Sequence, residues 1–107
     1  SEAIDASDAY DRAPCPLSDP KFADLRLTLT SVSFAGADTV EPGRLDAAWR
    51  DYAGKEIAVA AICDIRDRAA ALLRDDGYVA SVQVPVQTIE GGALRFSVVV
   101  ARLVSLV

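Results

Sequence analysis

The chain of 107 residues contains no histidine and no methionine, and it contains only two cysteines. Histidine is the usual general base beside a nucleophile and a common zinc ligand, so its absence removes the simplest catalytic and metal-binding arrangements. Two isolated cysteines do not complete a typical four-ligand zinc site. The carboxylates are scattered along the sequence and form no evident acid–base pair. We therefore expect no enzymatic activity, no cofactor and no metal.

Long apolar runs and clustered basic residues are also absent. No stretch approaches the roughly 20 residues that a transmembrane helix needs. Eleven Lys and Arg residues against sixteen Asp and Glu residues give a net charge of −5, and no basic stripe gathers them. The sequence thus predicts neither nucleic-acid binding nor direct insertion into a membrane. Its length fits one globular domain, and its polar beginning and strand-like end suggest a domain of a longer chain.

The clearest local pattern is an amphipathic helix over residues 62–75 that ends at a glycine. Its apolar residues recur with helical spacing. They are Ile62, Ile65, Ala69, Leu72 and Leu73. The other side carries Arg66, Arg68 and Arg74, for which a solvated face is a more common outcome than a contact surface. Gly77 supplies the left-handed residue that commonly ends a helix.

A strand follows this glycine directly, because the apolar period drops to two at Tyr78. Proline has no amide proton for a strand ladder, so Pro85 indicates that the strand over residues 78–86 lies at a sheet edge. Such an edge beside an amphipathic helix could bind an extended peptide through backbone hydrogen bonds. The alternative is that Pro85 only protects the edge from aggregation.

The beginning of the chain is predicted to have two parts. Residues 1–24 show no sustained period and are expected to form a polar leader. The domain proper is expected over residues 25–107. Its first strand covers residues 25–34, where the apolar positions change parity. Either a bulge at Thr30 or Ser31 reconciles the two halves, or the strand is covered on both faces.

Residues 42–52 are predicted to form another helix, opened by Pro42 and followed by Gly54. Its apolar residues are Leu45, Ala48, Trp49 and Tyr52. This spacing favours a core position for Trp49 over a role as a ligand platform.

A last strand is predicted over residues 94–100, after a glycine-bearing turn at residues 89–92 of the kind that joins antiparallel strands. Both of its faces are apolar, which suits a central strand. The resulting order is β-α-α-β-β. It predicts an α+β fold in which two helices pack on one face of a three-stranded sheet.

Cys15 and Cys63 leave one possible disulfide, and two unpaired thiols are the alternative. Cys15 lies in a Pro-Cys-Pro stretch ahead of any regular structure, where a core thiol has little reason to be. A bridge would tether the leader to the helix over residues 62–75 and would contribute roughly 4 kcal/mol in the chain-entropy model. It would also imply an oxidising compartment.

Several short motifs occur in order along the chain. They are Gly54-Lys55, Gly77-Tyr78-Val79, Val84-Pro85-Val86-Gln87, and Gly92 followed by Leu94-Arg95-Phe96. Together with the β-α-α-β-β order, they resemble the polypeptide-transport-associated (POTRA) domain. The most similar variant is the first POTRA domain of two-partner secretion transporters, also called TpsB or haemolysin secretion/activation proteins. The resemblance covers residues 25–107.

The resemblance implies a periplasmic domain at the outer membrane of a Gram-negative bacterium. In that family, POTRA domains precede an outer-membrane β-barrel and capture the secreted partner. The implied partners are therefore the secreted polypeptide, an adjacent POTRA domain and the barrel of the same chain. Carried onto this sequence, capture would involve Val79, Ala80, Ser81, Val82, Gln83, Val84, Arg66 and Leu73.

The same resemblance bears on the cysteines. Family members often have one cysteine before the first strand and another near the start of the second helix, which favours a bridge between Cys15 and Cys63. In this chain, Cys63 lies within the predicted helix, after Ile62, and so departs from the family pattern.

Two other functions remain open. The domain could be a scaffold that docks against a neighbouring domain or a barrel rim, as in barrel-assembly factors and cell-division POTRA proteins. It could also be a small ferredoxin-like enzyme, although the lack of histidine counts against this. Access to the strand edge over residues 79–84 separates capture from docking.

Overall fold

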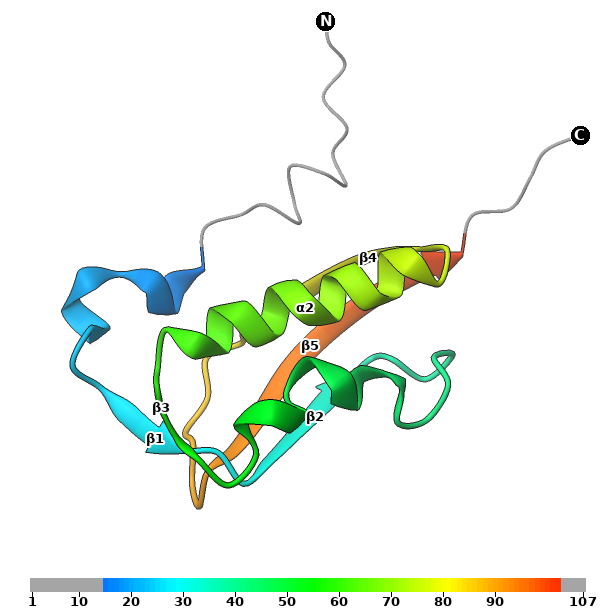
Figure 1. The fold of residues 1–107 in the computed structure, drawn as a ribbon. Helices are drawn as coiled ribbons and strands as arrows, with labels where there is room; N and C mark the ends of the chain where they lie inside the picture. Colours follow the sequence, from blue (N-terminus) through cyan, green and yellow to red (C-terminus); the bar gives the residue numbers. More distant parts are fainter. Residues whose placement is uncertain (1–14, 103–107) are drawn as a thin grey trace, which may run out of the picture.

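The structure is a computed structural model that describes residues 15–102. Its main sheet has the strand order β2-β5-β4, with β2 at Ser31–Ala35, β4 at Tyr78–Gln83 and β5 at Ala93–Arg102. One long helix, α2 (Ala61–Asp75), packs along this sheet (Figure 1). The predicted α+β fold is therefore confirmed, with the last strand in the centre.

Helix α2 forms where the sequence predicts it, and its apolar stripe is in the core. Ile62, Ile65, Ala69 and Leu73 are fully buried. Gly77 follows the helix with φ of 89°, a conformation that glycine adopts without strain. Strand β4 begins at the next residue, Tyr78, and runs back along α2.

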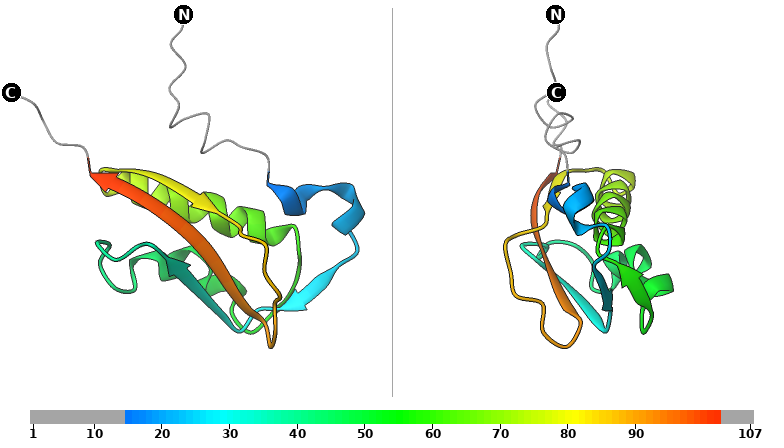
Figure 2. Two further views of the ribbon diagram at one scale, coloured as in Figure 1. Left: turned by 180° about the vertical axis from the view of Figure 1, so that it is seen from behind. Right: turned by 90° about the vertical axis from the view of Figure 1, so that its left-hand side faces the viewer.

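The central strand β5 pairs on both sides. It runs parallel to β2, from Ser31 opposite Ala93 to Ala35 opposite Ser97, and antiparallel to β4. The side chains that alternate toward α2 are buried, and the ring of Phe96 stacks on Phe34 with centroids 5.3 Å apart. Figure 2 shows α2 and the shorter helices on the same face of the sheet.

The predicted first strand divides into two strands that belong to different sheets. Strand β1 (Arg26–Thr28) pairs with β3 (Glu56–Ala58) in a two-stranded sheet, whereas β2 joins the main sheet. Leu29 between them is completely buried and shares backbone hydrogen bonds with the chain at residues 54–55. The change in parity therefore marks a switch between sheets.

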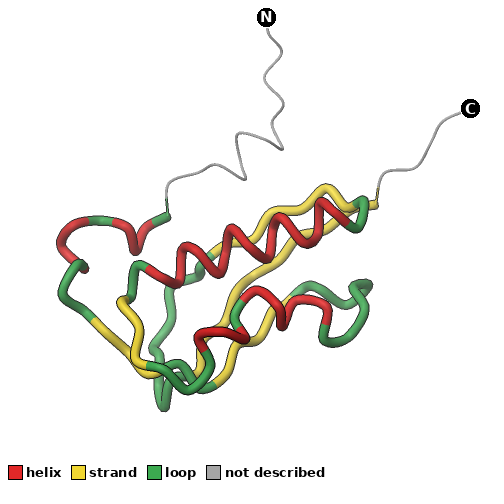
Figure 3. The backbone as a smooth tube through the Cα atoms, viewed as in Figure 1, coloured by secondary structure: helices red, strands yellow, loops and turns green. Residues whose placement is uncertain are grey.

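The segment predicted as the first helix consists of two 3₁₀ helices, η3 (Arg44–Ala48) and η4 (Arg50–Tyr52), which Figure 3 shows as separate turns. Gly43 precedes them with φ of 83°, and Trp49 interrupts them with φ of −132°. Helices this short are marginal and take their stability from packing. Their apolar residues still reach the core, where Leu45 and Ala48 are buried.

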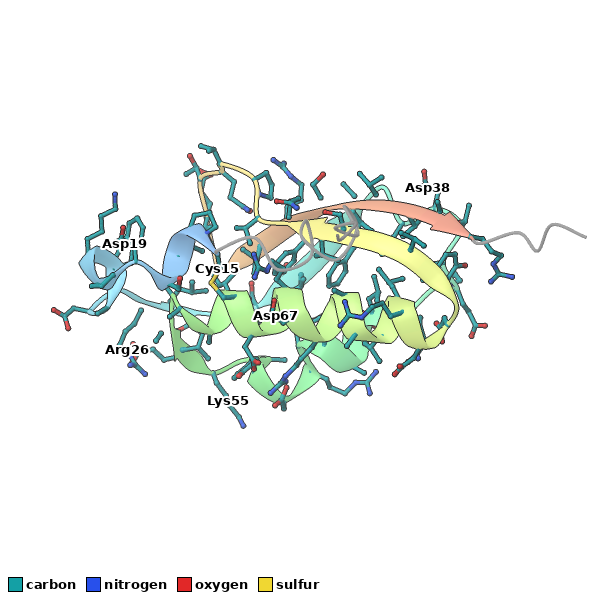
Figure 4. The ribbon with its side chains drawn as sticks, turned by 90° about the horizontal axis from the view of Figure 1, so that it is seen from above. Cys15, Asp19, Arg26, Asp38, Lys55 and Asp67 are labelled. Carbon is teal, nitrogen blue, oxygen red and sulfur yellow. A yellow bond between two sulfur atoms is a disulfide. The ribbon has the colours of Figure 1, made fainter. Side chains whose placement is uncertain are left out.

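The structure describes the leader from Cys15 onward. It contains two short 3₁₀ helices, η1 (Pro16–Ser18) and η2 (Pro20–Phe22). A disulfide joins Cys15 to Cys63, with 5.8 Å between the Cα atoms. Figure 4 shows Cys15 beside the first turn of α2, so the part of the leader that the structure describes is covalently fixed to the domain.

Candidate functional site

Strand β4 is a terminal strand of the main sheet as far as the described residues show. The backbone N–H and C=O of Arg95 both face the β4 side of the sheet, where they bond to the side chain of Gln87. Because backbone groups alternate along a strand, Ser97 and Val99 also face β4 and pair with Gln83 and Ser81. The outward-pointing groups of β4 are then those of its even-numbered residues.

Those even-numbered residues are Tyr78, Ala80 and Val82. The side chains of Ala80 and Val82 point into the core, and each of these two residues is 4% exposed. Ser81 between them is 5% exposed, and its hydroxyl accepts a hydrogen bond from Nε2 of Gln83 at 2.7 Å. The middle of the predicted capture edge is thus buried, backbone included.

The other residues expected in the capture groove differ in position. Val79, Gln83 and Val84 are partly buried. Leu73 is fully buried, so its side chain belongs to the core and does not reach a surface. Arg66, expected on the solvated side of the helix, is also buried and forms an ion pair with Asp67 at 3.0 Å.

Gln87 explains the Val-Pro-x-Gln motif. Its side-chain oxygen accepts from the Arg95 N–H at 2.8 Å, and its Nε2 donates to the Arg95 carbonyl at 2.8 Å. Nε2 also donates to the carbonyl of Pro85. Strand β4 ends at Gln83, and the amide of Gln87 then takes the place of the next strand residue beside β5. The motif therefore stabilises the sheet after the proline interrupts the strand.

Tyr78 explains the Gly-Tyr motif in a similar way. Its hydroxyl donates to the carbonyl of Thr39 at 3.1 Å, and the guanidinium of Arg102 lies 5.0 Å from its ring centroid. The tyrosine thus ties the loop after β2 to the start of β4 and the end of β5. Both motifs position the edge strand and neither presents a reactive group.

The leader creates a feature that the sequence analysis missed. A hollow of about 290 Å³ lies between the leader and the loop that follows β4. We call it the leader pocket. Its walls include Leu17 and Phe22 from the leader and Val84, Val86 and Ile89 from the loop. No periodicity in the leader announces it, because its walls come from two segments that are distant in the sequence.

A group of polar and charged side chains connects α2 to η4. Arg68 forms ion pairs with Asp51 at 2.7 Å and Asp64 at 3.0 Å. The hydrogen bond from Arg68 lowers the pKa of Asp51. The hydroxyl of Tyr52 donates to Asp64 at 2.7 Å, and this bond, with burial, raises the pKa of the tyrosine. These side chains hold two helices together.

Residues 15–102 contain no group of three or more Cys, Asp or Glu side chains placed to hold a metal ion. Within the same residues, no helix combines the length and apolar character needed to cross a bilayer.

Comparison with known proteins identifies a matching family and a solved structure of similar fold. The family described as "POTRA domain, ShlB-type" matches residues 27–100. The structure of CdiB from Escherichia coli is similar with a TM-score of 0.62 and 17% sequence identity, over 87% of this chain and 18% of CdiB. This chain thus spans about a fifth of that protein, and the likeness concerns the fold. No curated protein sequence matches the chain.

Proposed function

The chain belongs to the ShlB-type POTRA domain family, and from this premise we propose that it is the client-recognition domain of a two-partner secretion transporter. In this proposal it lies in the periplasm, at the outer membrane of a Gram-negative bacterium, and it is not an enzyme. The disulfide supports an oxidising compartment such as the periplasm. The neighbours in the parent chain are a further POTRA domain and a β-barrel.

One observation carries the proposal: β4 ends the described sheet, packs against α2, and turns the backbone groups of Ala80 and Val82 away from β5. An extended client segment that adds to this edge gains main-chain hydrogen bonds with little dependence on its sequence. Such binding suits a transporter whose client arrives unfolded. Because the client must be released toward a pore, we expect an affinity of roughly micromolar or weaker, about 8 kcal/mol at most.

The burial of Ala80, Ser81 and Val82 adds a condition to this mechanism. Residues that are at most 5% exposed offer a partner little surface until the edge is uncovered. The apparent affinity therefore falls by the fraction of molecules in which the edge is open. We expect binding to be limited by this opening rather than by diffusion.

A domain boundary near residue 25 is part of the same proposal. The family match begins at residue 27, and β1 begins at Arg26. The leader before it is held by Cys15 and contributes the wall of the leader pocket, so we treat it as an attached arm. Residues 1–14 lie outside the described part of the chain.

The scaffold function is the second candidate, and the outer face of the sheet favours it. The side chains on this face are small and mostly uncharged, among them Ser33, Ala35, Ser97 and Ala101, and all four are exposed. Val99 on the same face is 64% exposed. A flat face of this kind can pack against a neighbouring domain, whereas capture uses the edge of the same sheet.

The deciding experiment is a backbone-amide NMR titration with the N-terminal secretion segment of the partner encoded beside the parent transporter gene. Capture predicts shifts at residues 79–84, together with slower hydrogen exchange of the Ala80 and Val82 amides. Docking predicts that these signals stay unchanged at millimolar peptide while the domain remains folded. The second outcome would remove the capture proposal and leave the scaffold function.

A matched pair of variants tests the role of the backbone edge. Ala80→Pro removes one outward amide proton without removing a bond to β5, since proline is tolerated at such edge positions. Ala80→Ser keeps that proton and serves as the control. We expect the proline variant to lose binding and the serine variant to keep it.

A further inference from the structure

The leader pocket lies where an extended segment on β4 would continue. Strand β4 ends at Gln83, and the wall of the leader pocket begins with the next residue, Val84. Figure 1 shows β4 running from the end of α2 toward the leader. Since a strand advances about 3.3 Å per residue, a segment paired opposite Ala80 and Val82 reaches the pocket two to four residues later.

The chemistry of the leader pocket selects an apolar occupant. Among residues 15–102, Gln87 is the only polar side chain in its wall, and the amide of Gln87 is already bonded to the backbone of Arg95 and Pro85. A charged or polar ligand would therefore find no free side-chain partner there. Val86 at the rim is completely exposed, at 101% of its reference surface. Burial of such surface by a hydrocarbon side chain is favourable.

We propose that the leader pocket receives one bulky apolar side chain of the client segment, two to four residues beyond the stretch that pairs with β4. This inference rests on the proposed capture function and gives it a specificity. The client is then an extended segment with a leucine, isoleucine or phenylalanine at that offset. The disulfide is part of the site, because it holds the wall formed by Leu17 and Phe22 in place.

The test uses synthetic peptides with blocked ends and a common stretch of alternating threonine and valine. One pair carries leucine or serine three residues after the stretch, and a second pair carries leucine or serine three residues before it, so that both strand directions are covered. Dissociation constants come from NMR titration of the 107-residue chain. In one of the two pairs we expect leucine to bind about tenfold more tightly than serine. The leucine peptide should also shift Leu17, Phe22 and Ile89.

Two matched variants locate the effect. Val86→Asp places a charge at the rim of the leader pocket and should remove the tenfold preference for leucine. Val99→Asp makes the same change at another exposed valine, on the outer face of the sheet, and should leave the preference intact. Both valines are exposed, so neither change removes core packing.

The outcomes separate this inference from the proposed function. Equal binding of leucine and serine peptides, with shifts at residues 79–84, would overturn the pocket assignment and leave strand addition in place. No binding by any peptide would overturn both. If dilution of the protein alone shifts Leu17 and Ile89, a second copy occupies the pocket, and the assignment to the client is wrong.

Discussion

Removal of the Cys15–Cys63 disulfide is expected to destabilise the domain by about 4 kcal/mol. The bridge joins residues 48 positions apart. For a loop of this length, the chain-entropy relation gives roughly 14 cal/mol/K, which is about 4 kcal/mol at 25 °C. Typical domains have a free energy of unfolding of about 5–15 kcal/mol, so this loss would be a large share of the total.

The leader itself contributes little to this figure. Cys15 is buried, but none of the residues of η1 and η2 is. Most of the effect therefore comes from the greater freedom of the unfolded chain after the bridge is lost. For a domain of this size, 4 kcal/mol corresponds to a decrease in Tm of roughly 15–30 °C.

The assay compares urea unfolding of the wild type with that of a double variant, Cys15→Ser with Cys63→Ser. The double variant leaves no lone thiol that could form dimers. Wild-type protein in reductant provides the matched control and should unfold at the same urea concentration as the variant. The variant should also show a larger m value, because its unfolded chain exposes more surface.

A loss below about 1 kcal/mol, with the m value unchanged, would refute the reasoning. It would mean that the leader separates from the domain before the domain unfolds. The bridge would then not restrict the unfolded chain of the domain. The same variant offers a check on the leader pocket. In the double variant the leader is no longer attached to α2, so the wall formed by Leu17 and Phe22 is not held in place. The variant should therefore bind the leucine and serine peptides equally well.

Three further changes test the local structure. Gln87→Ala removes two hydrogen bonds to the exposed backbone of Arg95, each worth about 0.5–1.5 kcal/mol net, and should cost about 1–3 kcal/mol in urea unfolding. Gly36→Ala directs a methyl group into a β5 carbonyl at φ of 96° and should cost more than Gly77→Ala, which meets no atom within 4 Å. The pKa of Asp51 is lowered by the hydrogen bond from Arg68, so the stability that this pair adds is present above pH 4 and is lost as the pH falls through the lowered pKa. Thermal unfolding between pH 6 and pH 2 should show this loss in the wild type and less of it in Arg68→Gln.

The sequence predicts the joint between α2 and β4 well, because independent local signals agree there. The end of the helical period, the left-handed Gly77 and the start of period two at Tyr78 each place the same boundary. Strand β5 is equally clear, since a strand that is apolar on both faces suits the centre of a sheet. These elements together determine where the edge strand lies.

The sequence does not predict the features that depend on distant partners. Strand β3 has three residues, and its pairing with β1 across about 30 residues leaves no local period to detect. The leader pocket likewise has walls from two segments that are distant in the sequence. The 3₁₀ form of residues 44–52 follows from the backbone at Gly43 and Trp49, which an apolar stripe alone does not show.

Two of the predicted site residues illustrate a different limit. Leu73 was expected both on the apolar stripe and in the binding groove, yet a helix that packs on its own sheet keeps that stripe in the core. Arg66 follows Ile62 by four residues and precedes Ala69 by three, so the helical period itself places it beside the core. The position of Arg66 around the helix axis, next to the apolar stripe, predicts its burial. Its residue type alone suggests a solvated position.

Edge burial and the leader pocket act on client affinity in opposite directions. If the β4 edge were open in about one molecule in a hundred, the apparent affinity of a bound segment would fall about a hundredfold. A side chain in the leader pocket would restore about tenfold of that loss. A segment without an apolar residue at the right offset would then bind too weakly to be retained, while one that has it would still leave readily. Selection therefore does not require tight binding, because the closed edge weakens all segments alike and the pocket favours only those with the correct spacing.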